Sequence, residues 1–151
     1  MVKIKVVDLL QQSINVYQQI AEEKNIVIKV DLQTDAEVYV DVDAIRVVFR
    51  NLISNAIKFS YPKGKIVVSD KTKHGFIKIS ITDNGVGIKI EKLISLFDYS
   101  SKQSTKGTSG EEGSGLGLLL TKELAEQNNG KLSVKSKPGV ETKFTVTLPL
   151  V

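Results

Sequence analysis

The sequence contains no cysteine and no tryptophan, and it has a single histidine, His74. Without cysteine the chain cannot form a disulfide, a thiolate metal site or a cysteine nucleophile. No apolar run approaches the roughly 18 residues that a membrane-spanning helix needs. Residues 1–8 also lack the apolar segment of a signal peptide. We therefore expect a cytoplasmic chain without membrane contact of its own, although its parent could be membrane-anchored.

The overall composition is that of an ordinary globular domain. The 151 residues are 41% hydrophobic and 25% charged, which predicts a single domain, residues 1–151, around one core. The net charge is +4, carried by lysines that are scattered along the sequence without a dense basic stripe. This balance does not favour nucleic acid as a partner.

Apolar periodicity predicts both strands and helices. Alternation indicates strands at residues 2–6, 26–32, 38–40, 65–69, 76–82, 131–136 and 143–148. Three- and four-residue spacing indicates a helix from Leu9 capped by Asp8, a second at 41–60 capped by Asp41 or Asp43, and further helices at 88–97 and 114–128. Hairpins outnumber helical crossovers. We therefore expect an α+β fold, a two-layer α/β sandwich with a mixed, mostly antiparallel sheet and about three helices on one face.

The second predicted helix carries two asparagines four residues apart. Asn51 and Asn55 lie on one helical face, with Lys58 one turn further on. An amide oxygen suits Mg²⁺, which prefers oxygen ligands, and a nearby lysine can reach a phosphate. The alternative, which this helix alone slightly favours, is two solvent-facing amides.

Two glycine-containing segments follow. Asp83 ends an apolar strand and opens Asp-Asn-Gly-Val-Gly-Ile, residues 83–88, where the carboxylate could accept a hydrogen bond from an adenine amine and the glycines allow close approach. An ordinary Asp-Asn-Gly turn is equally compatible with this pattern. Residues 113–118 have the sequence Gly-Ser-Gly-Leu-Gly-Leu and lead into a helix, whose N-terminus suits phosphate. The alternative is a flexible loop with an ordinary helix cap. The chain has neither the dinucleotide fingerprint nor a P-loop.

A long polar stretch lies between these segments. Residues 98–113 are rich in serine, threonine, glycine and lysine and lack apolar periodicity. Loops of this length inside a domain are usually functional or disordered. Lys102 and Lys106 could fold over a triphosphate as an ATP lid.

In this order, the segments resemble the ATP-binding catalytic domain of bacterial sensor histidine kinases, in the superfamily shared with DNA gyrase, Hsp90 and MutL. Residues 51–60 look like the N box, 83–88 like the G1 box, 96–97 like the F box and 113–118 like the G2 box. Thr142 lies in a segment similar to the family's closing strand. Each motif is weak alone, but together they cover nearly the whole chain.

The resemblance implies a role for each matching residue. Asn55 would coordinate Mg²⁺ with support from Asn51, and Lys58 would contact the phosphates; these three are the catalytic candidates. Asp83 would accept a hydrogen bond from the adenine amine. The remaining implied ATP contacts are Phe59, Gly85, Gly87, Ile88, Phe97, Lys102, Lys106, Gly113, Ser114, Gly115, Leu116, Gly117 and Thr142. Glu141 departs from the pattern, since the family often has glycine there.

The resemblance also implies a function. The chain would bind Mg-ATP and donate the γ-phosphoryl group to a histidine on a separate dimerisation and phosphoacceptor domain, with a response regulator downstream. That helical hairpin is absent, and His74 is expected to be a surface turn residue. Hydrolytic superfamily members carry a glutamate base where this chain has Asn51, which favours transfer over hydrolysis. The alternatives are a non-catalytic nucleotide-sensing module and a serine kinase of the anti-sigma-factor type.

Overall fold

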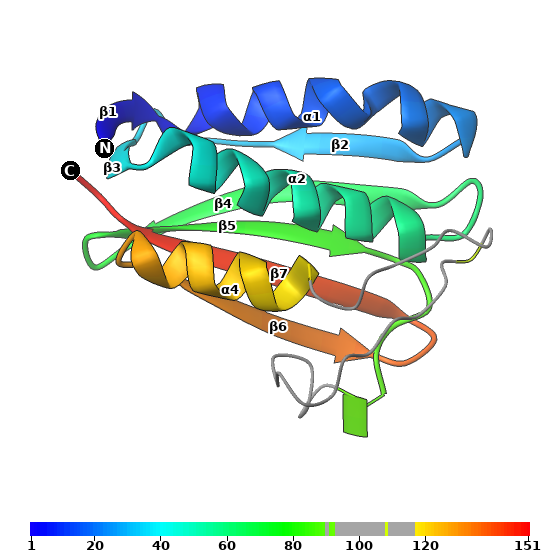
Figure 1. Cartoon of the computed structure of the whole chain (residues 1–151). Helices are drawn as coiled ribbons and strands as arrows, with labels where there is room; N and C mark the ends of the chain where they lie inside the picture. The colour runs from blue at the N-terminus through cyan, green and yellow to red at the C-terminus, as the bar shows by residue number, and fades with distance from the viewer. Residues whose placement is uncertain (90, 93–107, 109–116) are drawn as a thin grey trace.

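The computed structural model describes residues 1–89, 91–92, 108 and 117–151. Its helices and strands occur along the chain in an order that mixes hairpins and crossovers (Figure 1). The elements are β1 (Val2–Lys5), α1 (Val6–Glu23), β2 (Val27–Asp31), β3 (Glu37–Val40), α2 (Val42–Phe59), β4 (Lys65–Lys73), β5 (Phe76–Asp83), α4 (Gly117–Gln127), β6 (Lys131–Lys137) and β7 (Glu141–Pro149).

The main sheet has five strands in the order β2-β4-β5-β7-β6. The β2–β4 pair is parallel and the other three pairs are antiparallel, while β1 and β3 form a separate antiparallel pair. Figure 1 shows α1, α2 and α4 packed on one face of this sheet. The predicted two-layer α+β sandwich with a mixed, mostly antiparallel sheet is therefore confirmed.

The core lies between the helices and the inner sheet face. The alternation along β5 shows which side chains enter the core. Ile77, Ile79 and Ile81 are at most 2% exposed, while Lys78 between them is exposed. Successive side chains of a strand point to opposite faces. On α2, apolar residues at three- and four-residue steps face this layer; they are Ile45, Val48, Phe49, Leu52, Ile53, Ala56 and Ile57. The outer face of the sheet consequently carries mostly polar side chains, although Phe76 and Val27 are exposed there.

The two long helices begin in different ways. The prediction that Asp41 or Asp43 caps α2 is resolved in favour of Asp41, whose carboxylate accepts from the backbone N–H groups of Asp43 and Ala44 at 3.1 and 3.2 Å. The prediction for α1 is wrong, since α1 starts at Val6 instead of Leu9 and has no side-chain cap. The Val6 N–H instead donates to Ala36 O at 3.1 Å, a bond between segments far apart in sequence.

Other boundaries differ less. Strand β4 continues to Lys73, beyond the predicted end at residue 69, because it pairs with β5 up to the turn at His74 and Gly75. Most of the predicted 88–97 helix and residues 114–116 of the last helix lie outside the described residues. Among the described helices, none is long and apolar enough to cross a membrane.

Candidate nucleotide-binding site

The predicted site residues that the structure describes come from four elements. They lie at the C-terminal end of α2, the end of β5, the start of β7 and the start of α4, which share one end of the sandwich (Figure 1). Each element therefore contributes its terminus to the same region. The remaining predicted ATP contacts lie outside the described residues: Phe97, Lys102, Lys106, Gly113, Ser114, Gly115 and Leu116.

Asn51 and Asn55 are both half-buried on α2, but their surroundings differ. The Asn51 side-chain amide donates to Thr121 Oγ1 at 3.1 Å and to Gly117 O at 3.5 Å, which ties α2 to the first turn of α4. Asn55 makes no side-chain hydrogen bond to any other described residue, so its amide oxygen remains able to accept or to coordinate a cation. The described residues contain no group of three His, Cys, Asp or Glu side chains that could hold a metal. The Asn55 amide oxygen is a type of ligand that Mg²⁺ accepts.

The end of α2 is held by three other segments. Lys24 Nζ donates to the carbonyls of Ile57 and Lys58 at 2.9 and 3.1 Å. The Val86 N–H donates to Phe59 O at 3.1 Å, and the Thr108 N–H donates to Lys58 O at 3.0 Å. These bonds satisfy carbonyls that a helix terminus leaves without intrahelical partners. The centroid of the Phe59 ring also lies 4.9 Å from Lys58 Nζ, within cation–π range.

Asp83 lies at the end of β5 and is 4% exposed. Its Oδ1 accepts from the Gly85 N–H at 2.9 Å. Burial raises the pKa of this carboxyl from 3.8 to about 6, the Gly85 N–H lowers it, and the charge of Glu141 raises it. A buried carboxyl with a perturbed pKa is the type of group that binds or reacts with a ligand. Only one hydrogen bond from a described residue engages the Asp83 side chain, so it retains acceptor capacity.

The two glycines after Asp83 allow protein segments to approach each other. A Cβ at Gly85 would lie 1.9 Å from Phe59 O, and one at Gly87 would lie 2.3 Å from Lys137 O. Gly87 also has a φ of +70°, which glycine adopts without strain. The sequence pattern predicted close approach to a ligand. The structure shows that close approach between this turn, α2 and the β6–β7 hairpin also requires these glycines.

Thr142 is the direct cross-strand neighbour of Asp83 and is 4% exposed. Its hydroxyl lies 2.9 Å from Ser136 Oγ, which also accepts from the Ile88 N–H at 2.7 Å and donates to Glu141 O at 2.8 Å. The Gly139 N–H donates to Val86 O as well. This chain of bonds fixes the turn after β5 on the β6–β7 hairpin. Sequence reasoning missed Ser136, because a lone serine in a strand gives no signal until its partners are placed.

The site therefore presents a buried carboxylate, an adjacent buried hydroxyl, a polar helix face and a helix N-terminus at one end of the sandwich. This combination defines a binding site for a polar ligand of nucleotide type. Residues 40–151 match the family described as histidine kinase-, DNA gyrase B-, and HSP90-like ATPase, and the chain belongs to that family.

Several curated proteins are similar to the chain. It is 34% identical over 150 residues to a non-motile and phage-resistance protein of Caulobacter vibrioides. It is 31% identical over 151 residues to an autoinducer 2 sensor kinase/phosphatase, LuxQ, of Vibrio parahaemolyticus. Each alignment covers 95% of this chain but only 18% of the relative, so the chain spans less than a fifth of these proteins.

The fold is shared with solved histidine kinase catalytic domains. The catalytic domain of histidine kinase ThkA superposes with a TM-score of 0.84 at 22% identity, covering 98% of this chain and 94% of that one. A mycobacterial sensor histidine kinase, MprB, gives a TM-score of 0.81 at 23% identity, covering 99% and 97%. The predicted assignment to the histidine kinase ATPase domains of two-component sensors is confirmed. The individual site residues and the extent of the domain stay predictions.

Proposed function

We propose that this chain binds Mg-ATP and donates the γ-phosphoryl group to a histidine on a separate dimerisation and phosphoacceptor domain. The observation that carries this proposal is Asp83, a buried carboxylate at a strand end in a chain of this ATPase family. Its free acceptor capacity suits the exocyclic amine of adenine, and Thr142 lies beside it to support the base or a bridging water.

The phosphate side of the proposed site is formed by α2 and α4. Asn55 would hold Mg²⁺ through its amide oxygen, and Lys58 would neutralise phosphate charge. The described part of α4 begins at Gly117, and the N–H groups and dipole at the N-terminal end of a helix favour an anion. When bound, Mg²⁺ would neutralise charge on the phosphate oxygens. The residues of this chain would position ATP for a nucleophile on another domain.

Transfer is favoured over hydrolysis by Asn51. An amide cannot take a proton at neutral pH, so it cannot act as the general base that activates water. In this chain the Asn51 amide is also engaged with Thr121 and Gly117 of α4. The position therefore has a role in holding the two helices together.

Possible partners follow from the relatives. LuxQ is described as a sensor kinase/phosphatase, and one ThkA structure contains a response regulator protein, TrrA. We infer that this chain works with a phosphoacceptor domain of its parent protein and with a response regulator. The exposed His74 is an unsuitable acceptor, because it lies in the turn before β5, about 23 Å of strand away from Asp83.

The Asp83→Asn variant tests the adenine contact. We expect the variant to lose about 1–3 kcal/mol of ATP affinity, the scale of a mispaired buried polar contact. Calorimetric titration with ATP and Mg²⁺ measures this loss. Asp31→Asn, at an exposed carboxylate of β2, is the matched control and should bind ATP normally. ATP affinity that is equal in both variants would remove Asp83 from the nucleotide site.

A further inference from the structure

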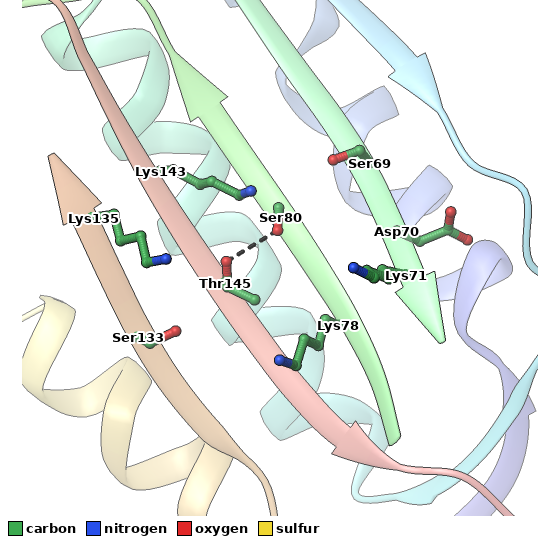
Figure 2. A pocket seen from close by; sticks show the side chains of 9 residues that line it. All are labelled: Ser69, Asp70, Lys71, Lys78, Ser80, Ser133, Lys135, Lys143 and Thr145. Atoms are coloured by element: carbon green, nitrogen blue, oxygen red, sulfur yellow. Dashed lines mark hydrogen bonds between the residues drawn. The ribbon is translucent and has the colours of Figure 1, made fainter. Parts of the chain in front are cut away.

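The outer face of the five-stranded sheet is not covered by a described helix, and it contains a hollow of about 420 Å³ (Figures 1 and 2). This face points away from α1, α2 and α4, so the hollow is separate from the proposed nucleotide site. The residues that line it are Ser69, Asp70, Lys71, Lys78, Ser80, Ser133, Lys135, Lys143 and Thr145. They come from β4, β5, β7 and β6, which makes the hollow a feature of the sheet.

A row of hydroxyl groups crosses the middle of the hollow. Ser69, Ser80, Thr145 and Ser133 are successive cross-strand neighbours on four adjacent strands. Ser80 Oγ and Thr145 Oγ1 lie 3.0 Å apart, as the dashed line in Figure 2 marks. Backbone groups in the middle of a sheet are already paired, so these hydroxyls are the groups that can meet a ligand there.

Two pairs of lysines lie on either side of this row. Lys71 is directly opposite Lys78, and Lys135 is directly opposite Lys143. Like charges in direct cross-strand positions destabilise a sheet. None of the four makes an ion pair with a described residue, and Figure 2 shows the ammonium groups of Lys71, Lys135 and Lys143 turned toward the Ser80–Thr145 pair. The arrangement gathers four positive charges around the hollow.

The acid among the lining residues does not offset this charge. The Asp70 carboxylate accepts the backbone N–H groups of Gln33 and Thr34 at 3.0 and 2.7 Å. Figure 2 shows it directed away from the hydroxyl row. Asp70 therefore stabilises the segment after β2, and the centre of the hollow presents ammonium and hydroxyl groups.

We propose that this hollow binds a small ligand that carries two or more phosphate groups. Ammonium and hydroxyl donors together recognise phosphate oxygens, and the volume lies in the range of small-molecule sites. The two lysine pairs lie in rows four residues apart along the strands, about 13 Å. A ligand with at least two phosphate groups is needed to contact both pairs. This site is independent of the nucleotide site and of the proposed phosphoryl transfer.

Sodium tripolyphosphate is the probe for this site, titrated into the chain while backbone amide NMR signals are followed. The ionic strength is held at about 0.15 M, so that general screening stays constant. We expect signals of Ser69, Ser80, Ser133 and Thr145 to shift. The double variant Lys135→Gln/Lys143→Gln should weaken tripolyphosphate binding at least tenfold. The matched control Lys29→Gln/Lys73→Gln removes the same charge from the same sheet outside the lining, and should change binding less than twofold.

Three outcomes would overturn the proposal. Signal shifts confined to the turn after Asp83 and to α4 would assign the binding to the nucleotide site. Equal weakening by both double variants would show general attraction to a basic protein. Hexaglutamate peptide is the comparison for an acidic polypeptide, and tighter binding of this peptide than of tripolyphosphate would assign the surface to an acidic protein segment.

Discussion

Asp83 combines deep burial with a pKa that is raised to about 6, mainly because its ionised form loses hydration. In the unfolded chain the carboxyl has a pKa near 3.8, so between about pH 4 and pH 6 the folded protein holds a proton that the unfolded chain has released. Stability therefore falls as the pH rises through this window, and the cost is complete above pH 6. A shift of about two pKa units corresponds to an effect on the order of 3 kcal/mol.

This linkage predicts that Asp83→Asn is more stable than the parent at neutral pH, although it binds ATP less well. We expect its free energy of unfolding to be about 1–3 kcal/mol higher at pH 7 and nearly the same at pH 4. The amide can still accept from the Gly85 N–H, so the local bond is kept. Urea denaturation of both proteins at the two pH values measures the difference. A gain of equal size at pH 4 would show that ionisation is not its cause.

At the scale of elements, the turn after β5 closes on α2 because Gly85 has no side chain. A Cβ at this position would lie 1.9 Å from Phe59 O, and backbone at a helix end cannot easily shift. We expect Gly85→Ala to destabilise the protein by about 1–3 kcal/mol or more, as overpacking does. Thermal unfolding measures the effect.

Gly117→Ala is the matched control for Gly85→Ala. Gly117 is the first residue of the described part of α4, and a Cβ there meets no described residue within 4 Å. Alanine also has a higher helix propensity than glycine. The control should unfold at the same temperature as the parent or higher. If both alanine variants unfold like the parent, the close contact between Gly85 and Phe59 does not constrain the turn.

Lys24 fixes the end of α2 from the end of α1. Its ammonium group donates to two terminal carbonyls, where the helix dipole favours a cation. We expect Lys24→Met, which keeps the apolar stem, to lower the free energy of unfolding by about 1–3 kcal/mol. Lys29→Met on the exposed face of β2 should leave it unchanged. Urea denaturation compares the two variants, and an equal effect would indicate loss of general charge and not of these bonds.

Local signals predicted the elements well where the deciding groups are close in sequence. Asp41 caps α2 through bonds to residues two and three positions on, which the sequence pattern contains. The start of α1 was not predictable, because the Val6 N–H is satisfied by the distant Ala36 carbonyl. The end of β4 was also missed, since its polar residues 70–73 stay in the strand through backbone pairing with β5. Long-range backbone bonds are invisible to periodicity.

The end of the last helix is another feature that local sequence signals describe only in part. Helix α4 ends at Gln127, and Asn129 after it has a left-handed φ of 60°. The Gly130 N–H donates to Ala125 O at 2.9 Å. Glycine is the residue usually expected at the left-handed position. Gly130 is required for another reason, because a Cβ there would lie 2.3 Å from Thr147 O.

At the scale of the whole molecule, the fold brings together groups that the sequence separates. Asp83 and Thr142 were both predicted as site residues, and pairing of β5 with β7 places them opposite each other. The lysines around the outer hollow are scattered along the chain and predicted no cluster, yet the strand register makes them two pairs. Strand register is not visible in the sequence, so the sequence gives no sign of the lysine pairs. The residues of the nucleotide site could be proposed because they follow a family pattern, and their roles stay predictions.

We propose above that this chain holds ATP for a histidine on another domain. The most direct measurement mixes the chain with γ-labelled ATP, Mg²⁺ and the phosphoacceptor hairpin of its parent protein, and then tests the labelled product in acid and in alkali. We expect label on the hairpin that is lost in acid and kept in alkali, as for phosphohistidine, and little free phosphate from the chain alone. Acid-stable label would contradict it in favour of a serine kinase, and rapid release of free phosphate by the chain alone would contradict it in favour of a hydrolase.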